Sequence, residues 1–247
     1  MGPDSRSREL AGLIERPFAH RGLHGDGRIE NSLAAFEAAI EAGMGIELDV
    51  QISLDGDAVI FHDERVDRLT EASGAVAELS AAALSQIRLA GSDGFIPTLR
   101  QGLALIAGRV PLLIELKTPG RRVEPLCRAV LKCLDSYSGH VAPMSFNPQV
   151  GAWFARRAPD RLRGLVVTER DGKWHAPLAR RLALWRAKPD FLAYDIRDLP
   201  SSFAARHRQR GIKLLTWTCR SEEERRRAAL HTDQIIYEVE QGPGPNE

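Results

Sequence analysis

The chain has 247 residues, of which 43% are hydrophobic and 27% charged, and its formal net charge is +1. These proportions are typical of a soluble globular protein, and the length suits one α/β barrel of ~250 residues, so we expect residues 1–247 to form a single domain. The nearly neutral charge balance excludes a global electrostatic attraction to nucleic acid or to an anionic membrane.

The lack of recognisable targeting signals and the pattern of cysteines lead us to expect a cytoplasmic protein. Residues 1–10 are polar and lack the apolar centre of a secretory signal. No apolar run reaches the ~18 residues that a membrane span requires, so we expect no stable membrane insertion. Cys127, Cys133 and Cys219 have no metal-like spacing and indicate buried thiols in a reducing compartment.

Apolar runs that predict strands alternate along the chain with amphipathic runs that predict helices. The expected strands are 17–20, 45–49, 58–61, 110–117, 141–146, 163–168, 190–196, 212–218 and 235–238. The expected helices are 7–15, 31–42, 79–89, 98–107, 123–134, 147–157, 176–187, 201–209 and 222–230. This alternation predicts a parallel α/β fold. Nine strands compete for the eight places of a TIM barrel, so one of them must be peripheral.

The barrel must be irregular after its second strand. The link between Asp49 and Ala58 is too short for a crossover helix. We therefore expect residues 50–56 to run back as extended chain.

The helix expected over residues 176–187 is basic. Leu178, Leu182 and Trp185 form one stripe along it. Its arginines indicate a solvated face, and a patch for acidic lipid headgroups is the alternative.

Two carboxylates lie close together on one expected strand. Glu47 and Asp49 are two residues apart, so their side chains point to the same face, opposite to Leu48. Burying both without a cation is costly, and paired oxygen ligands suit Mg²⁺ or Ca²⁺. The alternative is an edge strand with one solvated face.

Other strands repeat this pattern of an apolar body and a charged end. The first ends in His20-Arg21, the third in His62-Asp63, and the fourth in Glu115 and Lys117. Because chemistry in an α/β barrel takes place at the carboxyl ends of the strands, this pattern indicates an active site. A structural salt bridge between Glu115 and Lys117 is the alternative for that pair.

These motifs, in this order and spacing, resemble the glycerophosphodiester phosphodiesterase family. They are His20-Arg21-Gly22, Glu30-Asn31-Ser32, Glu47-Leu48-Asp49, Asp55-Gly56, His62-Asp63, Ile96-Pro97-Thr98-Leu99, Ile114-Glu115-Leu116-Lys117, Ser145-Phe146 and Trp217-Thr218. The resemblance runs over about residues 17–238. It implies an irregular TIM (β/α)8 barrel of the PLC-like phosphodiesterase type.

The resemblance also implies an activity and a cofactor. Members of the family hydrolyse glycerophosphodiesters to sn-glycerol 3-phosphate and an alcohol. It implies that His20 and His62 are the catalytic acid and base, without showing which is which. It further implies one divalent metal, Mg²⁺ or Ca²⁺, whose ligands are Glu47, Asp49 and Glu115. Attack by the glycerol 2-hydroxyl and direct attack by water both stay open.

Residue chemistry suggests how such a substrate would be held. Arg21 and Lys117 can bind phosphate oxygens, the first through its guanidinium fork and the second as a point charge. Trp217 is a candidate wall of the glycerol pocket, or else a core residue. We expect no nucleic-acid partner, and the sequence does not indicate an oligomeric state.

Several residues near the motifs are less informative. We expect His24 to be a solvated loop histidine, and Glu30 and Asn31 to be structural, with Asn31 or Ser32 capping a helix.

Two strand ends depart from the family pattern. Cys219-Arg220 stands where the family often has an apolar residue followed by Asn. Tyr237-Glu238 stands where the last strand of the family usually ends in Thr-Asp. Arg220 is a candidate to favour an additional anionic group on the substrate.

Two other functions compete with this one. A lysophospholipase D acting on lysophospholipids would need an apolar groove for the acyl chain. A barrel that binds phosphorylated ligands without catalysis would have lost a histidine or a metal-binding acid, and none is missing.

Overall fold

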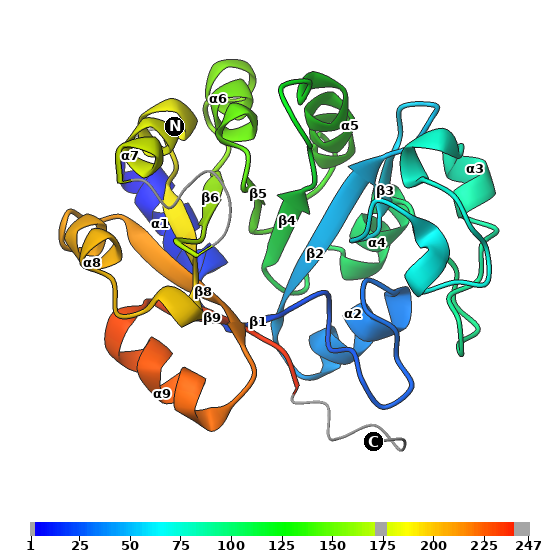
Figure 1. The fold of residues 1–247 in the computed structure, drawn as a ribbon, viewed down its shortest axis with the longest axis horizontal. Coiled ribbons are helices and arrows are strands. Elements are labelled where there is room, and N and C mark those ends of the chain that lie inside the picture. The colour runs from blue at the N-terminus through cyan, green and yellow to red at the C-terminus, as the bar shows by residue number, and fades with distance from the viewer. Residues whose placement is uncertain (1–2, 171–176, 240–247) are drawn as a thin grey trace.

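The computed structural model describes residues 3–170 and 177–239, and within them eight parallel strands close into a barrel (Figure 1). Around the barrel the order is β1, β2, β4, β5, β6, β7, β8 and β9, and β9 pairs with β1. The strands are β1 Phe18–Ala19, β2 Gly45–Ile52, β4 Leu112–Leu116, β5 Val141–Ser145, β6 Gly164–Val167, β7 Phe191–Asp195, β8 Lys213–Cys219 and β9 Gln234–Tyr237. The predicted TIM barrel is confirmed.

Helices surround the barrel and connect its strands (Figure 1). They are α1 Pro3–Leu13, α2 Leu33–Glu41, α3 Ala81–Leu84, α4 Leu99–Ile106, α5 Glu124–Leu134, α6 Pro148–Arg157, α7 Pro177–Ala187, α8 Ser202–Gln209 and α9 Glu222–His231. Short 3-10 turns are η1 Val66–Arg68, η2 Val76–Glu78 and η4 Ile196–Asp198. Most of these helices start where a side-chain oxygen accepts from the first turn, and these capping residues are Ser32, Ser80, Thr98, Asn147, Ser201 and Ser221.

The peripheral strand is β3, Ala58–Ile60, which pairs antiparallel with β2 outside the barrel. The prediction that residues 50–56 run back was wrong, because β2 continues to Ile52 and β3 makes the return. Apolar Val50 and Ile52 extend the buried strand beyond the acidic pair and give β3 an edge to bind. The Phe61 amide donates to the Asp49 carbonyl at 3.1 Å, which brings the residues after β3 to the barrel rim.

The alternating side chains of the strands form two apolar layers. Outward-facing residues such as Leu48 and Ile114 pack with helices α2, α4 and α5. Inward-facing residues such as Leu113 and Val166 form a second cluster inside the barrel. This cluster includes Leu13 at the end of α1, so α1 closes the barrel end opposite the site.

Leu13→Ala should lower the free energy of unfolding by about 2–5 kcal/mol, since a buried leucine removed from a packed core leaves a cavity. Leu13 is fully buried, whereas Leu54 in the β2–β3 turn is 68% exposed. Urea denaturation of both alanine variants measures the difference. A Leu13→Ala variant as stable as Leu54→Ala would show that α1 adds nothing to the core.

The apolar stripe on α7 faces outward. Leu178, Leu182 and Trp185 are 77%, 60% and 70% exposed, whereas Ala183 and Leu184 are buried beneath them. No helix of the described residues is long and apolar enough to cross a membrane.

The three cysteines are free thiols. Burial raises the pKa of Cys127 and of Cys219 to about 12, so neither is a reactive thiolate at neutral pH.

Candidate active site

Three carboxylates meet inside the open end of the barrel. Glu47 and Asp49 come from β2 and Glu115 from its neighbour β4, where Asp49 and Glu115 are register partners. One oxygen from each lies within 4.8 Å of the others, and the residues are 1%, 1% and 7% exposed. Burial and mutual repulsion raise the pKa of Glu47 well above its usual value and also raise that of Glu115. Such a group is suited to a divalent cation.

Two cations lie against these acids. Lys117 Nζ is 3.0 Å from Asp49 Oδ1 and 2.7 Å from Glu115 Oε1, and Arg21 Nε is 3.2 Å from Asp49 Oδ2. Burial opposes ionisation of Asp49, but the charges of Lys117 and Arg21 outweigh it and lower the pKa of Asp49. When all three carboxylates are ionised, they exceed the two cations by one negative charge, so the residues present fit a bound metal ion.

The loop before α2 positions this cluster. The side chain of Asn31 donates to Asp49 Oδ2 at 2.9 Å and accepts from the Asp49 amide at 3.2 Å. Ser32, and not Asn31, caps α2. Asn31 therefore holds a candidate metal ligand, a role beyond the expected helix cap. Glu30 binds Arg21 at 2.8 Å and Arg68 at 2.7 Å, which fixes the Arg21 guanidinium beside the acids.

His20 and His62 stand at the same rim, and each has a carboxylate partner. His20 Nδ1 is 2.8 Å from Glu238 Oε2, and His62 Nδ1 is 2.6 Å from Asp63 Oδ1. Burial lowers the pKa of His20 although its bond to Glu238 favours the charged form, so the ring is neutral at pH 7.

Glu238 also binds a second group. Arg220 donates to its Oε2 at 2.9 Å. Burial opposes ionisation of Glu238, but His20 and Arg220 lower its pKa to about 2. Arg220 lines the cavity, yet its pairing with Glu238 weakens the hypothesis that it serves an additional anionic group.

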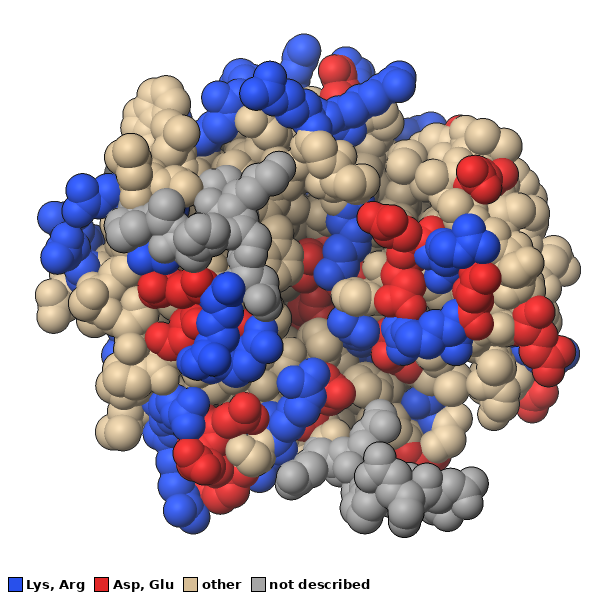
Figure 2. Space-filling view, in the orientation of Figure 1, with Lys and Arg blue, Asp and Glu red and all other residues tan. Residues whose placement is uncertain are grey.

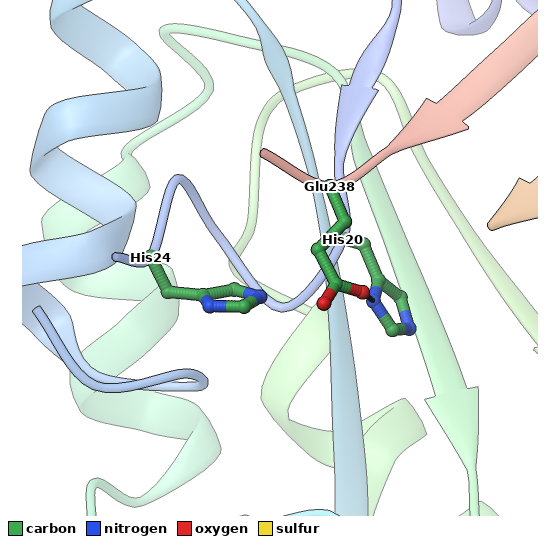
Figure 3. A group of neighbouring side chains, drawn as sticks. All are labelled: His20, His24 and Glu238. Carbon is green, nitrogen blue, oxygen red and sulfur yellow. Dashed lines mark hydrogen bonds and ion pairs between the residues drawn. The ribbon is translucent and has the colours of Figure 1, made fainter. Parts of the chain in front are cut away.

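His24 is buried, so the expectation of a solvated histidine was wrong. It is 8% exposed, and its Nε2 is buried without a hydrogen-bond partner among the described residues. Figure 3 shows its ring pointing toward Glu238 and His20.

A cavity of about 370 Å³ lies over these groups. Figure 2 shows this face hollowed near its centre, with acidic side chains at the bottom and basic ones beside them. His20, His62, Glu47, Glu115, Arg21 and Lys117 line it together with Trp217. The Trp217 indole donates to the Ala193 carbonyl at 2.9 Å, and its ring packs edge-on against Phe146 at 5.4 Å. Trp217 is thus an anchored wall of the cavity.

Comparison with known proteins identifies the family. The profile of the glycerophosphoryl diester phosphodiesterase family matches residues 20–238. A glycerophosphodiester phosphodiesterase of Caldanaerobacter subterraneus subsp. tengcongensis is 30% identical over 236 residues, which cover 89% of this chain and 92% of that protein. The chain belongs to this family. Glycerophosphodiester phosphodiesterases are hydrolases, and the chain is an enzyme of this type.

Other proteins share the sequence or the fold of this chain. The uncharacterized protein YqiK of Bacillus subtilis is 36% identical over 162 residues, which cover 62% of this chain and 66% of that protein. A phosphodiesterase of Oleispira antarctica, solved in complex with the product sn-glycerol-3-phosphate, has a TM-score of 0.80 at 23% identity and covers 92% of this chain and 94% of its own. A glycerophosphodiester phosphodiesterase of Thermotoga maritima has a TM-score of 0.74 at 24% identity, and the match covers 89% of this chain and 92% of that chain. These two likenesses show the fold.

The geometry of this glycerophosphodiester phosphodiesterase adds residues to which the sequence analysis assigned no catalytic or metal-binding role. Asn31, Asp63 and Glu238 each contact a predicted site residue. Asp63 directly follows His62, so its position in the chain was a usable signal. Glu238 was noted only as a departure from the family pattern, and its contact with His20 joins the two ends of the closed barrel.

Proposed function

We propose that this chain hydrolyses glycerophosphodiesters to sn-glycerol 3-phosphate and an alcohol, with one divalent metal, Mg²⁺ or Ca²⁺, and with histidine acid–base catalysis. The observation that carries the proposal is that a buried three-carboxylate group and two histidines, each with a carboxylate partner, meet at one cavity. A phosphodiester is anionic and has a poor leaving group, so its hydrolysis needs charge neutralisation, a base and an acid. This arrangement offers all three.

We propose that Glu47, Asp49 and Glu115 hold the metal. When bound, the ion would polarise a phosphoryl oxygen and neutralise part of the negative charge on the phosphate oxygens. Arg21 and Lys117, fixed by their ion pairs with the acids, contact the remaining phosphate oxygens. Trp217 bounds the glycerol end of the substrate through its apolar ring.

The histidines divide the proton transfers. His20, held neutral by burial, accepts the proton of the attacking hydroxyl or water. Glu238 accepts a hydrogen bond from the Nδ1–H of His20, which leaves Nε2 free as the base and stabilises the imidazolium that forms. His62, oriented by Asp63 and 29% exposed, donates a proton to the departing alkoxide.

We also propose that residues 17–238 are the motif-bearing part of one domain. The family match over residues 20–238 and the single closed barrel support this proposal.

Release of glycerol 3-phosphate from glycerophosphocholine tests the function. We expect release with Mg²⁺ or Ca²⁺, and none after EDTA treatment until metal is restored. A lysophospholipid is the comparison substrate, and we expect at least about a tenfold lower kcat/KM for it, which corresponds to ~1.4 kcal/mol of lost transition-state binding. Release that is equally fast in EDTA would contradict the metal proposal. Cleavage of the lysophospholipid that is faster than cleavage of glycerophosphocholine would contradict the proposed substrate class.

A further inference from the structure

A second group of side chains that could hold a metal ion lies beside the acid cluster. Its members are His20 after β1, His24 in the following loop, and Glu238 after β9 (Figure 3). One nitrogen from each histidine and one oxygen of Glu238 lie within 4.8 Å of one another. Apart from this group and the three carboxylates, the described residues contain no comparable cluster.

His24 supplies the observation that points to a ligand. Its side chain is more than nine-tenths buried, and its Nε2 has no hydrogen-bond partner in the part of the chain that the structure describes. Figure 3 shows this ring directed at Glu238 and His20. A buried imidazole nitrogen without a partner is unfavourable unless it binds something.

We propose that His20, His24 and Glu238 form a binding site for a transition-metal ion such as Zn²⁺, distinct from the acid cluster. Two imidazole nitrogens and one carboxylate oxygen are a ligand set that Zn²⁺ accepts, with the fourth position open to water. Mg²⁺ and Ca²⁺ prefer the all-oxygen group of Glu47, Asp49 and Glu115. The two sites therefore differ in the class of ion that they select.

The loop that carries His24 can close the site. Tetrahedral zinc ligands lie about 3.3 Å apart, so the group must contract. His20 Nδ1 and Glu238 Oε2 are already 2.8 Å apart, which leaves the movement to His24. Gly25 and Gly27 flank His24 on one side and have no atoms within 4 Å of an added Cβ, so this part of the loop has room to shift.

Positive charge near His24 opposes a cation, and its sources are Arg21 and Arg220. The Arg220 guanidinium donates to Glu238. Burial lowers the pKa of His24, the negative charges of Glu238 and Glu30 oppose this shift, and the positive charges of Arg21 and Arg220 add to it. Arg220 is 53% exposed, so its guanidinium can move into solvent when the ion takes its place on Glu238.

Zinc at this site would inhibit the proposed reaction. A neutral imidazole that binds a metal through Nδ1 carries its proton on Nε2. His20 could then accept no proton from the nucleophile. This consequence rests on the proposed function, whereas the binding itself does not.

Calorimetric titration of zinc chloride into protein saturated with Mg²⁺ tests the binding. We expect the His24→Gln variant to bind this zinc ion at least tenfold more weakly than wild type. We expect His231→Gln, which removes a histidine outside the group, to match wild type. Equal zinc affinity in wild type and His24→Gln, or no saturable binding in wild type, would overturn the proposal.

Two further measurements distinguish a failure of the zinc site from a variant that does not fold and from a failure of the proposed function. Imidazole ¹H–¹⁵N spectra of the wild-type protein should show zinc shifting the His20 and His24 rings and leaving His231 unchanged, which tests the site even if a variant does not fold. Zinc inhibition of glycerol 3-phosphate release should need at least tenfold more zinc in His24→Gln. Zinc binding without any turnover would sustain the metal site and reject the proposed function.

Discussion

Replacing Glu47 with glutamine should reduce glycerol 3-phosphate release by about a thousandfold or more, because the proposed metal would contribute several kcal/mol of transition-state stabilisation. Glutamine keeps the volume of the side chain and can still accept from the Arg21 amide, which donates to Glu47 Oε2 at 3.1 Å. The loss would therefore come from the missing charge on a proposed metal ligand. Metal affinity by calorimetry and turnover should fall together.

The same substitution should stabilise the metal-free protein. Burial and the neighbouring Asp49 and Glu115 raise the pKa of Glu47, so its ionised form is unfavourable in the folded state. A raised carboxyl pKa favours folding at low pH, and that stability is lost as the pH rises above the unfolded value of about 4.5. In EDTA, the melting temperature of Glu47→Gln should exceed that of wild type increasingly with pH, by about 2–4 °C per kcal/mol relieved.

Thermal melts of Glu47→Gln and of the exposed Glu78→Gln, with and without metal, measure this effect. Metal should reverse the order, because only wild type keeps the full ligand set. A Glu47→Gln variant with full activity, or one less stable than wild type in EDTA at every pH, would reject the assignment of this residue.

His20→Ala should lower kcat by about 10²–10⁴-fold, the range of general acid–base catalysis. Glu238→Gln alone should lower it by about 10–100-fold, because the histidine loses its orienting carboxylate. If Glu238 acts through His20, adding Glu238→Gln to His20→Ala should cost almost nothing further. Independent effects that multiply would show that Glu238 has another role.

The pH profile of Glu238→Gln provides a second readout. Burial lowers the pKa of His20 and the bond to Glu238 opposes that shift, so without the carboxylate this pKa should fall further. The acidic limb of kcat/KM, already below the ordinary histidine value of about 6.5, should move to lower pH in the variant. An unchanged limb would indicate that another group is the base.

The sequence predicted most of the barrel because its strands are apolar and its helices begin at polar capping residues. Segments such as 110–117 and 123–134 matched β4 and α5 to within two residues at each end. β3 was harder to place, because the sequence pattern of a short apolar run does not distinguish a parallel barrel strand from an antiparallel strand beside the barrel. Only the pairing of Val50 with Ile60 decides between them.

The site was predictable where chemistry and spacing coincide. The two-residue interval of Glu47 and Asp49 placed both on one face, the family resemblance added Glu115, and the structure brings all three together from two neighbouring strands. His24 and Glu238 were not assigned roles, because their meeting depends on barrel closure between β1 and β9. Local patterns carry no information about such a contact.

Because β3 lies outside the barrel, the residues that follow it are held by a different part of the chain from the residues on the barrel strands. Its hydrogen-bonded neighbours in the described chain are β2 and a single bridge from Val59 to Thr98, and the cylinder closes without it. His62 therefore belongs to an appendage, whereas the carboxylates and His20 belong to the wall. Changes in the length or angle of this hairpin would move the proposed proton donor relative to the proposed phosphate site on the barrel. The fold thus provides a place where substrate size and leaving group can diverge while the barrel stays intact.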